Sequence, residues 1–221
     1  CPPVGSESDC VHRALHDLAC ELAAAGVTVL RISYPGCGDS LPADPALPPT
    51  RAWIDSIKHA WRWLGDAAGC EEVGLAGFRL GSTLAAVAAE ELGGVERLVM
   101  LAPVASGEAY IRERAMLARM GASAHGTDDG EAMDGGGLAF TPQLTAALKS
   151  LKLSGEGAPA ARKVLSLVRP GMSRDRQAAD RLEAQGAQCE TAAFDGYAAL
   201  MVNPEDAAYP KAAFAGVVAW M

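Results

Sequence analysis

The stretch that decides the fold runs from residue 73 to residue 82 and reads Val73-Gly74-Leu75-Ala76-Gly77-Phe78-Arg79-Leu80-Gly81-Ser82. Its first residues form a short apolar run, typical of a buried strand over Val73–Ala76. A tight turn follows, and an Ala-rich helix begins at Leu80. The stretch therefore predicts a strand, a turn and a helix in direct succession, with the side chain at the centre of the turn pointing out over the sheet.

The turn carries a glycine two residues on each side of Arg79, namely Gly77 and Gly81. This is the frame of the nucleophile elbow, G-x-S-x-G, in which the strained backbone of the central residue leaves no room for larger neighbours. Arginine cannot act as an acyl nucleophile, because its guanidinium stays protonated. Ser82 lies off the apex, within the first helical turn, and we do not favour it as a displaced nucleophile.

Strand-like and helix-like segments alternate around this unit, which predicts a parallel sheet covered by helices on both faces. The predicted helices are Val11–Leu22 (ended by Gly26), Thr50–Leu64 (with Thr50 as its N-cap), Leu80–Leu92, 174–185 and Pro210–Trp220. The predicted strands, besides Val73–Ala76, are Val27–Ile32, Val95–Leu101, Val164–Val168 and Ala187–Ala193.

The alternation breaks over residues 105–160, which we interpret as an insertion within a single domain of residues 1–221. Residues 105–120 have a helical pattern, and Thr141-Pro142 predicts the start of a second helix that ends near Leu151. Between them, residues 121–137 are rich in Gly, Asp and Ala. That tract suits a mobile lid or, equally, a poorly ordered surface loop.

The composition of the chain limits which partners and cell compartments are expected. The chain has 221 residues, 50% of them apolar, and a formal net charge of −8, which argues against nucleic acid or an anionic membrane as partner. No apolar run is long enough to span a bilayer, so a soluble protein is expected.

The six cysteines form no CxxC pair and are expected to be reduced and buried, which favours the cytoplasm. The chain opens at Cys1-Pro2-Pro3 without Met, so we expect a longer polypeptide.

Histidine is scarce, and its positions limit the chemistry. The four histidines are His12, His16, His59 and His125, so no imidazole follows residue 125. His12 and His16 have the i, i+4 spacing that zinc can use, but they lack a third ligand. We predict neither a metal nor a cofactor.

Three further segments, together with the elbow, resemble the α/β-hydrolase superfamily over nearly the whole chain. They are Cys1–Glu7, which resembles the oxyanion loop; Arg31–Ser40, which is similar to the family's D-Y-x-G-x-G-x-S loop; and Leu101-Ala102-Pro103. The resemblance is greatest to a bacterial branch related to exosortase-associated and serine aminopeptidase-like hydrolases. It implies a three-layer α/β fold with a mostly parallel sheet and a small helical cap, lacking the family's N-terminal strands.

The same resemblance assigns site positions, and the residues found there depart from the family. Arg79 takes the place of the nucleophile, Asp175 that of the acid, and Tyr197 that of the histidine. A Ser-His-Asp relay would therefore lack two of its three members. The residues that the resemblance places around the oxyanion hole and elbow are Val4, Gly77, Phe78, Leu80 and Gly81.

Two functional hypotheses remain, and the sequence leaves open whether the protein is an enzyme. One is a hydrolase of ester, thioester or amide bonds that uses Glu7, Asp175, Asp195 and Tyr197 as acid–base groups. The alternative is a non-catalytic protein that binds a small anion, a carboxylate or phosphate, at Arg79. Against both stands a structural interpretation, in which Arg79 forms an internal ion pair with Glu7. The oligomeric state cannot be predicted.

Overall fold

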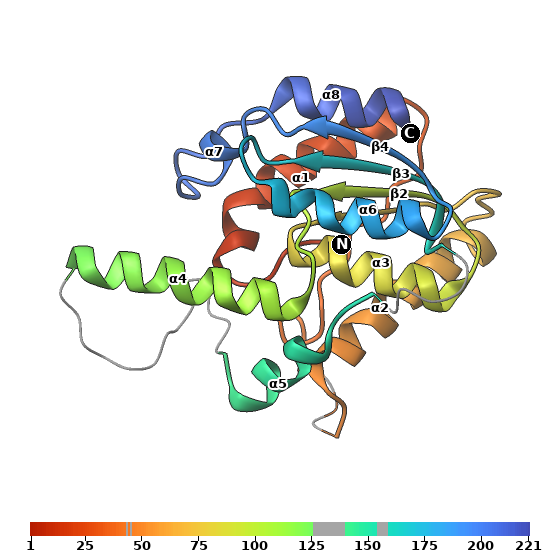
Figure 1. The fold of residues 1–221 in the computed structure, drawn as a ribbon. Coiled ribbons are helices and arrows are strands. Elements are labelled where there is room, and N and C mark those ends of the chain that lie inside the picture. The colour runs from red at the N-terminus through yellow and green to blue at the C-terminus, as the bar shows by residue number, and fades with distance from the viewer. Residues whose placement is uncertain (43, 45, 126–139, 154–158) are drawn as a thin grey trace.

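The computed structural model describes residues 1–42, 44, 46–125, 140–153 and 159–221, with the backbone alone for residues 118 and 120–125. Within this part of the chain, one sheet contains four parallel strands in the order β1-β2-β3-β4 (Figure 1). The strands are β1 (Leu75–Phe78), β2 (Val95–Leu101), β3 (Ala161–Val168) and β4 (Gln188–Ala193). Because all three pairings are parallel, the carboxyl ends of the four strands lie at the same edge of the sheet.

Helices cover both faces of the sheet (Figure 1). The helices are α1 (Ser6–Ala24), α2 (Pro49–Asp66), α3 (Leu80–Leu92), α4 (Gly107–His125), α5 (Pro142–Ser150), α6 (Arg176–Ala184), α7 (Tyr197–Leu200) and α8 (Lys211–Trp220), and a short 3-10 turn, Ser173–Asp175, precedes α6. One apolar core joins the sheet to α2, α3 and α6, and a second core joins it to α1 and α8. The result is a three-layer α/β arrangement.

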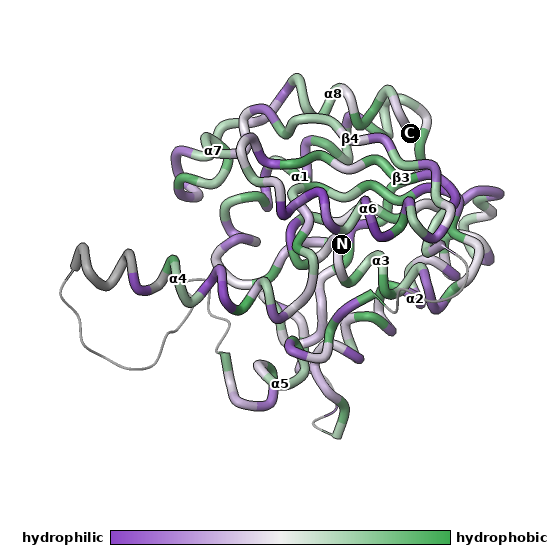
Figure 2. The backbone as a smooth tube through the Cα atoms, viewed as in Figure 1, coloured by the Kyte–Doolittle hydropathy of each residue, from purple (hydrophilic) through white to green (hydrophobic). Residues whose placement is uncertain are grey.

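The two cores explain why the strands are apolar without alternation. Leu98 of β2 belongs to the core with α2 and α3, whereas its neighbour Val99 belongs to the core with α1 and α8. Successive side chains of a strand point to opposite faces, so both faces of this sheet are buried. The hydropathy-coloured tube shows the strands as mostly green segments between helices of mixed colour (Figure 2).

Most of the predicted elements are confirmed. The helix over Leu80–Leu92 and the strand over Val95–Leu101 have the predicted bounds, and the last strand and last helix each begin one residue later than predicted. The strand of the elbow runs over Leu75–Phe78, two residues further along the chain. Thr50 is not the N-cap of its helix, because α2 already begins at Pro49, a residue that suits the first helical position.

The predicted strand over Val27–Ile32 is wrong. This segment follows α1 and has no ladder to a neighbouring strand in the described part of the chain. A groove separates it from β1, and its one backbone hydrogen bond in the described part of the chain, from the Val27 amide to the carbonyl of Leu22, belongs to the end of α1. Composition alone favoured a strand there, but a strand also requires an adjacent one.

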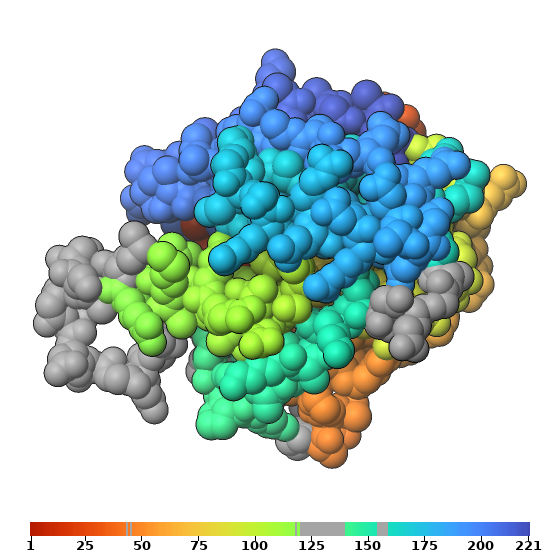
Figure 3. All heavy atoms as spheres, viewed as in Figure 1, coloured from red at the N-terminus to blue at the C-terminus, as the bar shows by residue number. Residues whose placement is uncertain are grey.

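The insertion supplies α4 and α5, which lie side by side on the face seen in Figure 3. Gly107 at the start of α4 allows this approach, since a Cβ there would lie 2.0 Å from the carbonyl oxygen of Leu148. As predicted, Thr141 caps α5 by accepting a hydrogen bond from the Leu144 amide at 3.1 Å. Helix α4 continues to His125, beyond the predicted end at residue 120. The expected lid tract, 121–137, otherwise falls outside the described residues.

None of the helices in the described ranges is both long enough and apolar enough to cross a membrane. The six cysteines are unpaired, as expected, but the prediction that they are buried is wrong. Cys20 is exposed and the other five are partly accessible. Cys1, Cys10, Cys37 and Cys189 lie at the margins of the two cores rather than inside them.

Candidate functional site

The elbow lies between β1 and α3, and its backbone is strained as the sequence predicts. Arg79 has φ 52° and ψ −120°, a conformation that side-chain-bearing residues rarely adopt. Its amide donates a hydrogen bond of 2.8 Å to the carbonyl of Leu101 at the end of β2. The turn thus ties the end of β1 to the end of β2 and sets Arg79 at the carboxyl edge of the sheet.

The two elbow glycines are required by close packing. A Cβ on Gly77 would lie 2.4 Å from the carbonyl oxygen of Gly81, and a Cβ on Gly81 would lie 2.3 Å from that of Pro2. The segment before α1 therefore packs directly on the elbow, with Val4 buried beneath it. This packing brings Glu7, in the first turn of α1, next to Arg79.

The predicted ion pair between Arg79 and Glu7 is present. Nε of Arg79 donates to Oε1 of Glu7 at 2.9 Å, and both side chains are buried, with exposures of 1% and 4%. Nη2 of Arg79 forms a second ion pair, at 2.8 Å, with Oε1 of Glu113 on α4. Nη1 lies 3.5 Å from the carbonyl oxygen of Ala102. All three nitrogens of the guanidinium are therefore engaged within the protein.

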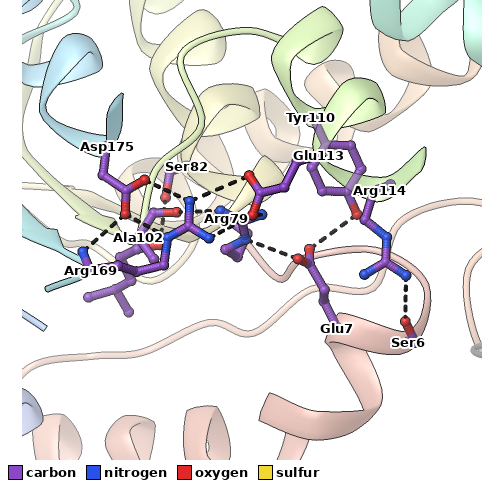
Figure 4. A network of polar contacts seen from close by, with 11 residues as sticks. Ser6, Glu7, Arg79, Ser82, Ala102, Tyr110, Glu113, Arg114, Arg169 and Asp175 are labelled. Carbon is purple, nitrogen blue, oxygen red and sulfur yellow. Dashed lines mark hydrogen bonds and ion pairs between the residues drawn. The ribbon is translucent and has the colours of Figure 1, made fainter. Parts of the chain in front are cut away.

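A second arginine extends this network across the edge of the sheet (Figure 4). Arg169 follows β3, and its Nη1 donates to the same Oε1 of Glu113 at 2.6 Å. Its Nε and Nη2 hold the Asp175 carboxylate at 2.8 and 2.7 Å. On the other side, the Tyr110 hydroxyl donates to Oε2 of Glu7 at 3.1 Å. We call the five charged residues Glu7, Arg79, Glu113, Arg169 and Asp175 the elbow network.

The electrostatics favour the charged form of each arginine and of the carboxylate between them. Burial works against the charge on Arg79, but the carboxylates of Glu7 and Glu113 outweigh it and raise the pKa of its guanidinium. The pKa of Arg169 is raised in the same way by Asp175 and Glu113. Burial would raise the pKa of Glu113, but hydrogen bonds and charge from the two arginines lower it. The elbow network carries two positive and three negative charges, a formal sum of −1.

The structure brings together only some of the predicted site residues. Tyr197 opens the short helix α7, where its ring lies 5.5 Å from the Arg169 guanidinium and stacks on Phe78. Burial raises the pKa of the Tyr197 hydroxyl. Asp195 is exposed and forms no hydrogen bond or ion pair with the elbow network in the described part of the chain. Ser82 is buried, and its hydroxyl lies 2.7 Å from the carbonyl oxygen of Gly77, to which it donates.

Sequence reasoning missed three members of the arrangement: Tyr110, Glu113 and Arg169. Arg169 had a usable signal, because it follows a parallel strand directly and such positions converge at the carboxyl edge of a sheet. Tyr110 and Glu113 had none. They come from the insertion, and no motif or spacing relates α4 to the elbow.

The paired histidines do not contribute to this site. His12 and His16 lie on the exposed side of α1, as the apolar pattern predicts. His16 Nδ1 is 3.2 Å from Nη1 of Arg31. No group of three or more metal-ligating side chains occurs among the residues that the structure describes.

The chain is similar in fold to a protein of known structure. A lipase-esterase related protein from Clostridium acetobutylicum ATCC 824 matches the chain with a TM-score of 0.57, covering 93% of this chain and 89% of that one. The chain therefore has a fold similar to that of this protein. Sequence identity is 13%, so the likeness concerns the fold alone. No family model matches the chain, and no curated protein does.

Proposed function

We propose that this chain has the α/β-hydrolase fold but does not carry out serine hydrolase chemistry. The observation that supports this is the state of Arg79. It occupies the apex of the elbow, where a nucleophile would have to stand, and it is buried and ion-paired with Glu7 and Glu113. A guanidinium in that position neither attacks a carbonyl carbon nor accepts a proton.

The surrounding groups do not supply the missing chemistry. Tyr197, at the family's histidine position, has a raised pKa, so it is a poor base at neutral pH. Asp175 is 1% exposed, and its carboxylate is held by Arg169 rather than by an imidazole. Val4 and Leu80, whose amides would form an oxyanion hole, are both buried. These groups support a structural role better than a catalytic one.

Hydrolysis of short p-nitrophenyl esters and labelling by a fluorophosphonate probe test this proposal. We expect turnover at the buffer background and no labelling, with a serine esterase as positive control. Turnover that is lost in Tyr197→Phe or Arg79→Ala, in samples whose circular dichroism matches the wild type, would support the hydrolase hypothesis instead. Labelling that is lost in Ser82→Ala would identify an active serine.

One observation favours a second candidate, an anion-binding protein. Oε1 of Glu113 bridges Arg79 and Arg169 at 2.8 and 2.6 Å, so a carboxylate already occupies the space between two guanidinium groups. The Glu113 side chain is 29% exposed, more than any other member of the elbow network. A carboxylate or phosphate from solution would bind here by taking the place of Glu113.

Thermal shift with inorganic phosphate and with acetate tests this second candidate. Glu113→Ala vacates the position, so anion should stabilise that variant more than the wild type. Glu108→Ala is the matched control, because it removes the same charge from an exposed position on the same helix. Equal shifts in the two variants, or an unchanged shift when Arg169→Gln is added to Glu113→Ala, would exclude the site.

A further inference from the structure

Helix α1 carries a thiol and an imidazole side by side on its exposed side. His16 and Cys20 are four residues apart, so their side chains are neighbours on the surface of the helix. Nε2 of His16 lies 3.7 Å from Sγ of Cys20, within hydrogen-bonding distance for a sulfur atom. Both residues are exposed, and neither belongs to the elbow network.

Arg31 contacts the His16 ring at its other nitrogen. Nη1 of Arg31 lies 3.2 Å from Nδ1 of His16, and Nη2 donates to the main-chain carbonyl of His12 at 3.3 Å. A guanidinium nitrogen can only donate, so Nδ1 of His16 is the acceptor in this contact. The neutral imidazole therefore carries its proton on Nε2, the atom that faces Cys20.

This proton position makes the sulfur of Cys20 the acceptor. A hydrogen bond donated to the sulfur stabilises the thiolate more than the thiol, and the thiolate is the nucleophilic form of cysteine. The same contact argues against a metal at this pair. An imidazole that binds a metal through Nε2 carries its proton on Nδ1, where the proton would face the Arg31 donor.

Two carboxylates of α1 adjoin the pair in sequence. Asp17 and Glu21 each follow one of its members, one position further round the helix. Burial and the charges of Glu21 and Asp17 raise the pKa of the Tyr209 hydroxyl, which places both carboxylates near that residue. Arg31 contacts the pair directly, and its positive charge favours a thiolate.

The other cysteines have different surroundings. Cys20 is exposed, whereas the remaining five are only partly accessible. Burial raises the pKa of the thiols of Cys10, Cys37 and Cys189, which keeps them protonated at neutral pH. Cys20 therefore combines exposure with a hydrogen-bond donor at its sulfur.

We propose that Cys20 is a site of reversible modification by low-molecular-weight disulfides, with His16 as the donor that activates its sulfur. The Cys20 thiolate attacks one sulfur of the reagent, and a bond forms between Sγ and that sulfur while the disulfide bond of the reagent breaks. The departing half keeps the electron pair and is reduced to a thiol, and Cys20 is oxidised to a mixed disulfide. The proton that Cys20 released balances the one that the departing half takes up. The inference does not depend on the proposed function.

Oxidised glutathione is the probe, and peptide mass spectrometry after an acid quench measures the modification of each cysteine. In the folded chain, we expect Cys20 to be modified about tenfold faster than Cys70, a partly accessible cysteine. In urea the two rates should become similar, because unfolding removes the contacts that distinguish the two thiols. A ratio that persists in urea would contradict the proposal.

Substitution of His16 separates activation from exposure. His16→Leu should lower the rate at Cys20 about threefold to tenfold, because the sulfur loses its donor. His12→Leu is the matched control, since it removes another exposed imidazole one turn earlier on α1 and should leave the rate unchanged. Arg31→Met should also lower the rate, because it allows the His16 proton to move to Nδ1.

The outcomes decide between activation and mere accessibility. An unchanged rate at Cys20 in His16→Leu would overturn the proposal, because exposure alone would then explain the reactivity. Faster modification of any other cysteine in the folded chain would overturn it as well. Circular dichroism and the rate at Cys70 are measured for every variant, so that a general loss of structure is distinguished from a loss at Cys20 alone.

Discussion

A buried guanidinium such as that of Arg79 is stable only when its surroundings replace the water that it has lost. Arg79 meets this condition through Glu7 on one side and Glu113 on the other. Arginine suits the position better than lysine, because its planar fork reaches partners in several fixed directions. The elbow, which holds its central residue in a strained conformation, thereby has a polar but fully satisfied apex.

Removing Arg79 should therefore be costly. We expect Arg79→Ala to lower the free energy of unfolding by about 3–5 kcal/mol, because it leaves the buried carboxylate of Glu7 without its ion-pair partner and removes one of the two arginines that bind Glu113. Urea unfolding followed by circular dichroism measures this. In a double-mutant cycle, Arg79→Met with Glu7→Gln should cost about 1 kcal/mol less than the sum of the single variants. Strict additivity would show that the pair is not coupled.

The elbow glycines give a second prediction at the scale of single residues. Gly81→Ala places a methyl group against the backbone of Pro2 and Cys1, and we expect a loss of about 2 kcal/mol or more in stability. Gly65→Ala is the matched control, since nothing lies within 4 Å of its added Cβ and the residue is in α2. That variant should gain up to about 1 kcal/mol. Equal effects in the two variants would disprove the packing argument.

At the scale of elements, the elbow network joins parts that are distant in sequence. Helix α4 supplies Glu113, the end of β3 supplies Arg169, and α1 supplies Glu7. Helix α4 is therefore attached to the carboxyl edge of the sheet by ion pairs, in addition to its contact with α5. Its attachment should depend on pH.

Glu113 sets the direction of that dependence. Its pKa is lowered in the folded state, so its contribution to stability is present above the ordinary glutamate pKa of about 4.3 and is lost as pH falls through the folded-state value. We expect Glu113→Gln to be less stable than the wild type at pH 7, and the difference to shrink as pH falls below about 4.3. Glu108→Gln serves as control, and a Glu113→Gln deficit that is constant with pH would contradict the argument.

Sequence reasoning succeeded where an element is defined by its own residues. The strand over Val95–Leu101 and the helix over Leu80–Leu92 are set by apolar content and by Gly93 just beyond the helix. It failed for Val27–Ile32, because pairing depends on a neighbour that the composition of the segment does not reveal. The contacts of Glu113 could not be predicted either, because they depend on how the insertion packs against the sheet.

At the scale of the whole molecule, the order of the elements was predictable and the polar interior was not. The alternation of apolar strands and amphipathic helices predicts a parallel sheet covered on both faces, and the described sheet has that form. The Arg79–Glu7 pair was expected from the cost of an unpaired buried charge together with the family resemblance, which places the segment of Glu7 beside the elbow. The connection through Arg169 to Asp175 could not be predicted. Many charged residues of the chain could balance the charge of Arg79, and the sequence does not show which of them lie close to it.

The overall charge gives a prediction at this scale. With a formal net charge of −8 and a sequence pI near 5.0, the protein should bind an anion-exchange resin at pH 7.5 and pass through heparin unretained. Self-association measured by light scattering should increase as pH approaches 5, where mutual repulsion is smallest. Retention on heparin at about 150 mM salt would reveal a basic surface that the overall charge conceals.

The way in which the carboxylates share two arginines also limits how this protein could change. Introducing the nucleophile alone, as Arg79→Ser, would leave Glu7 and Glu113 facing each other across a buried hydroxyl. Removing either carboxylate first would leave the buried guanidinium of Arg79 with one ion-pair partner instead of two. Each single step towards a serine at the apex thus passes through a less stable chain, whereas changes made together need not. The cost of unpaired buried charge, rather than the chemistry of the new side chain, therefore opposes each of these single substitutions.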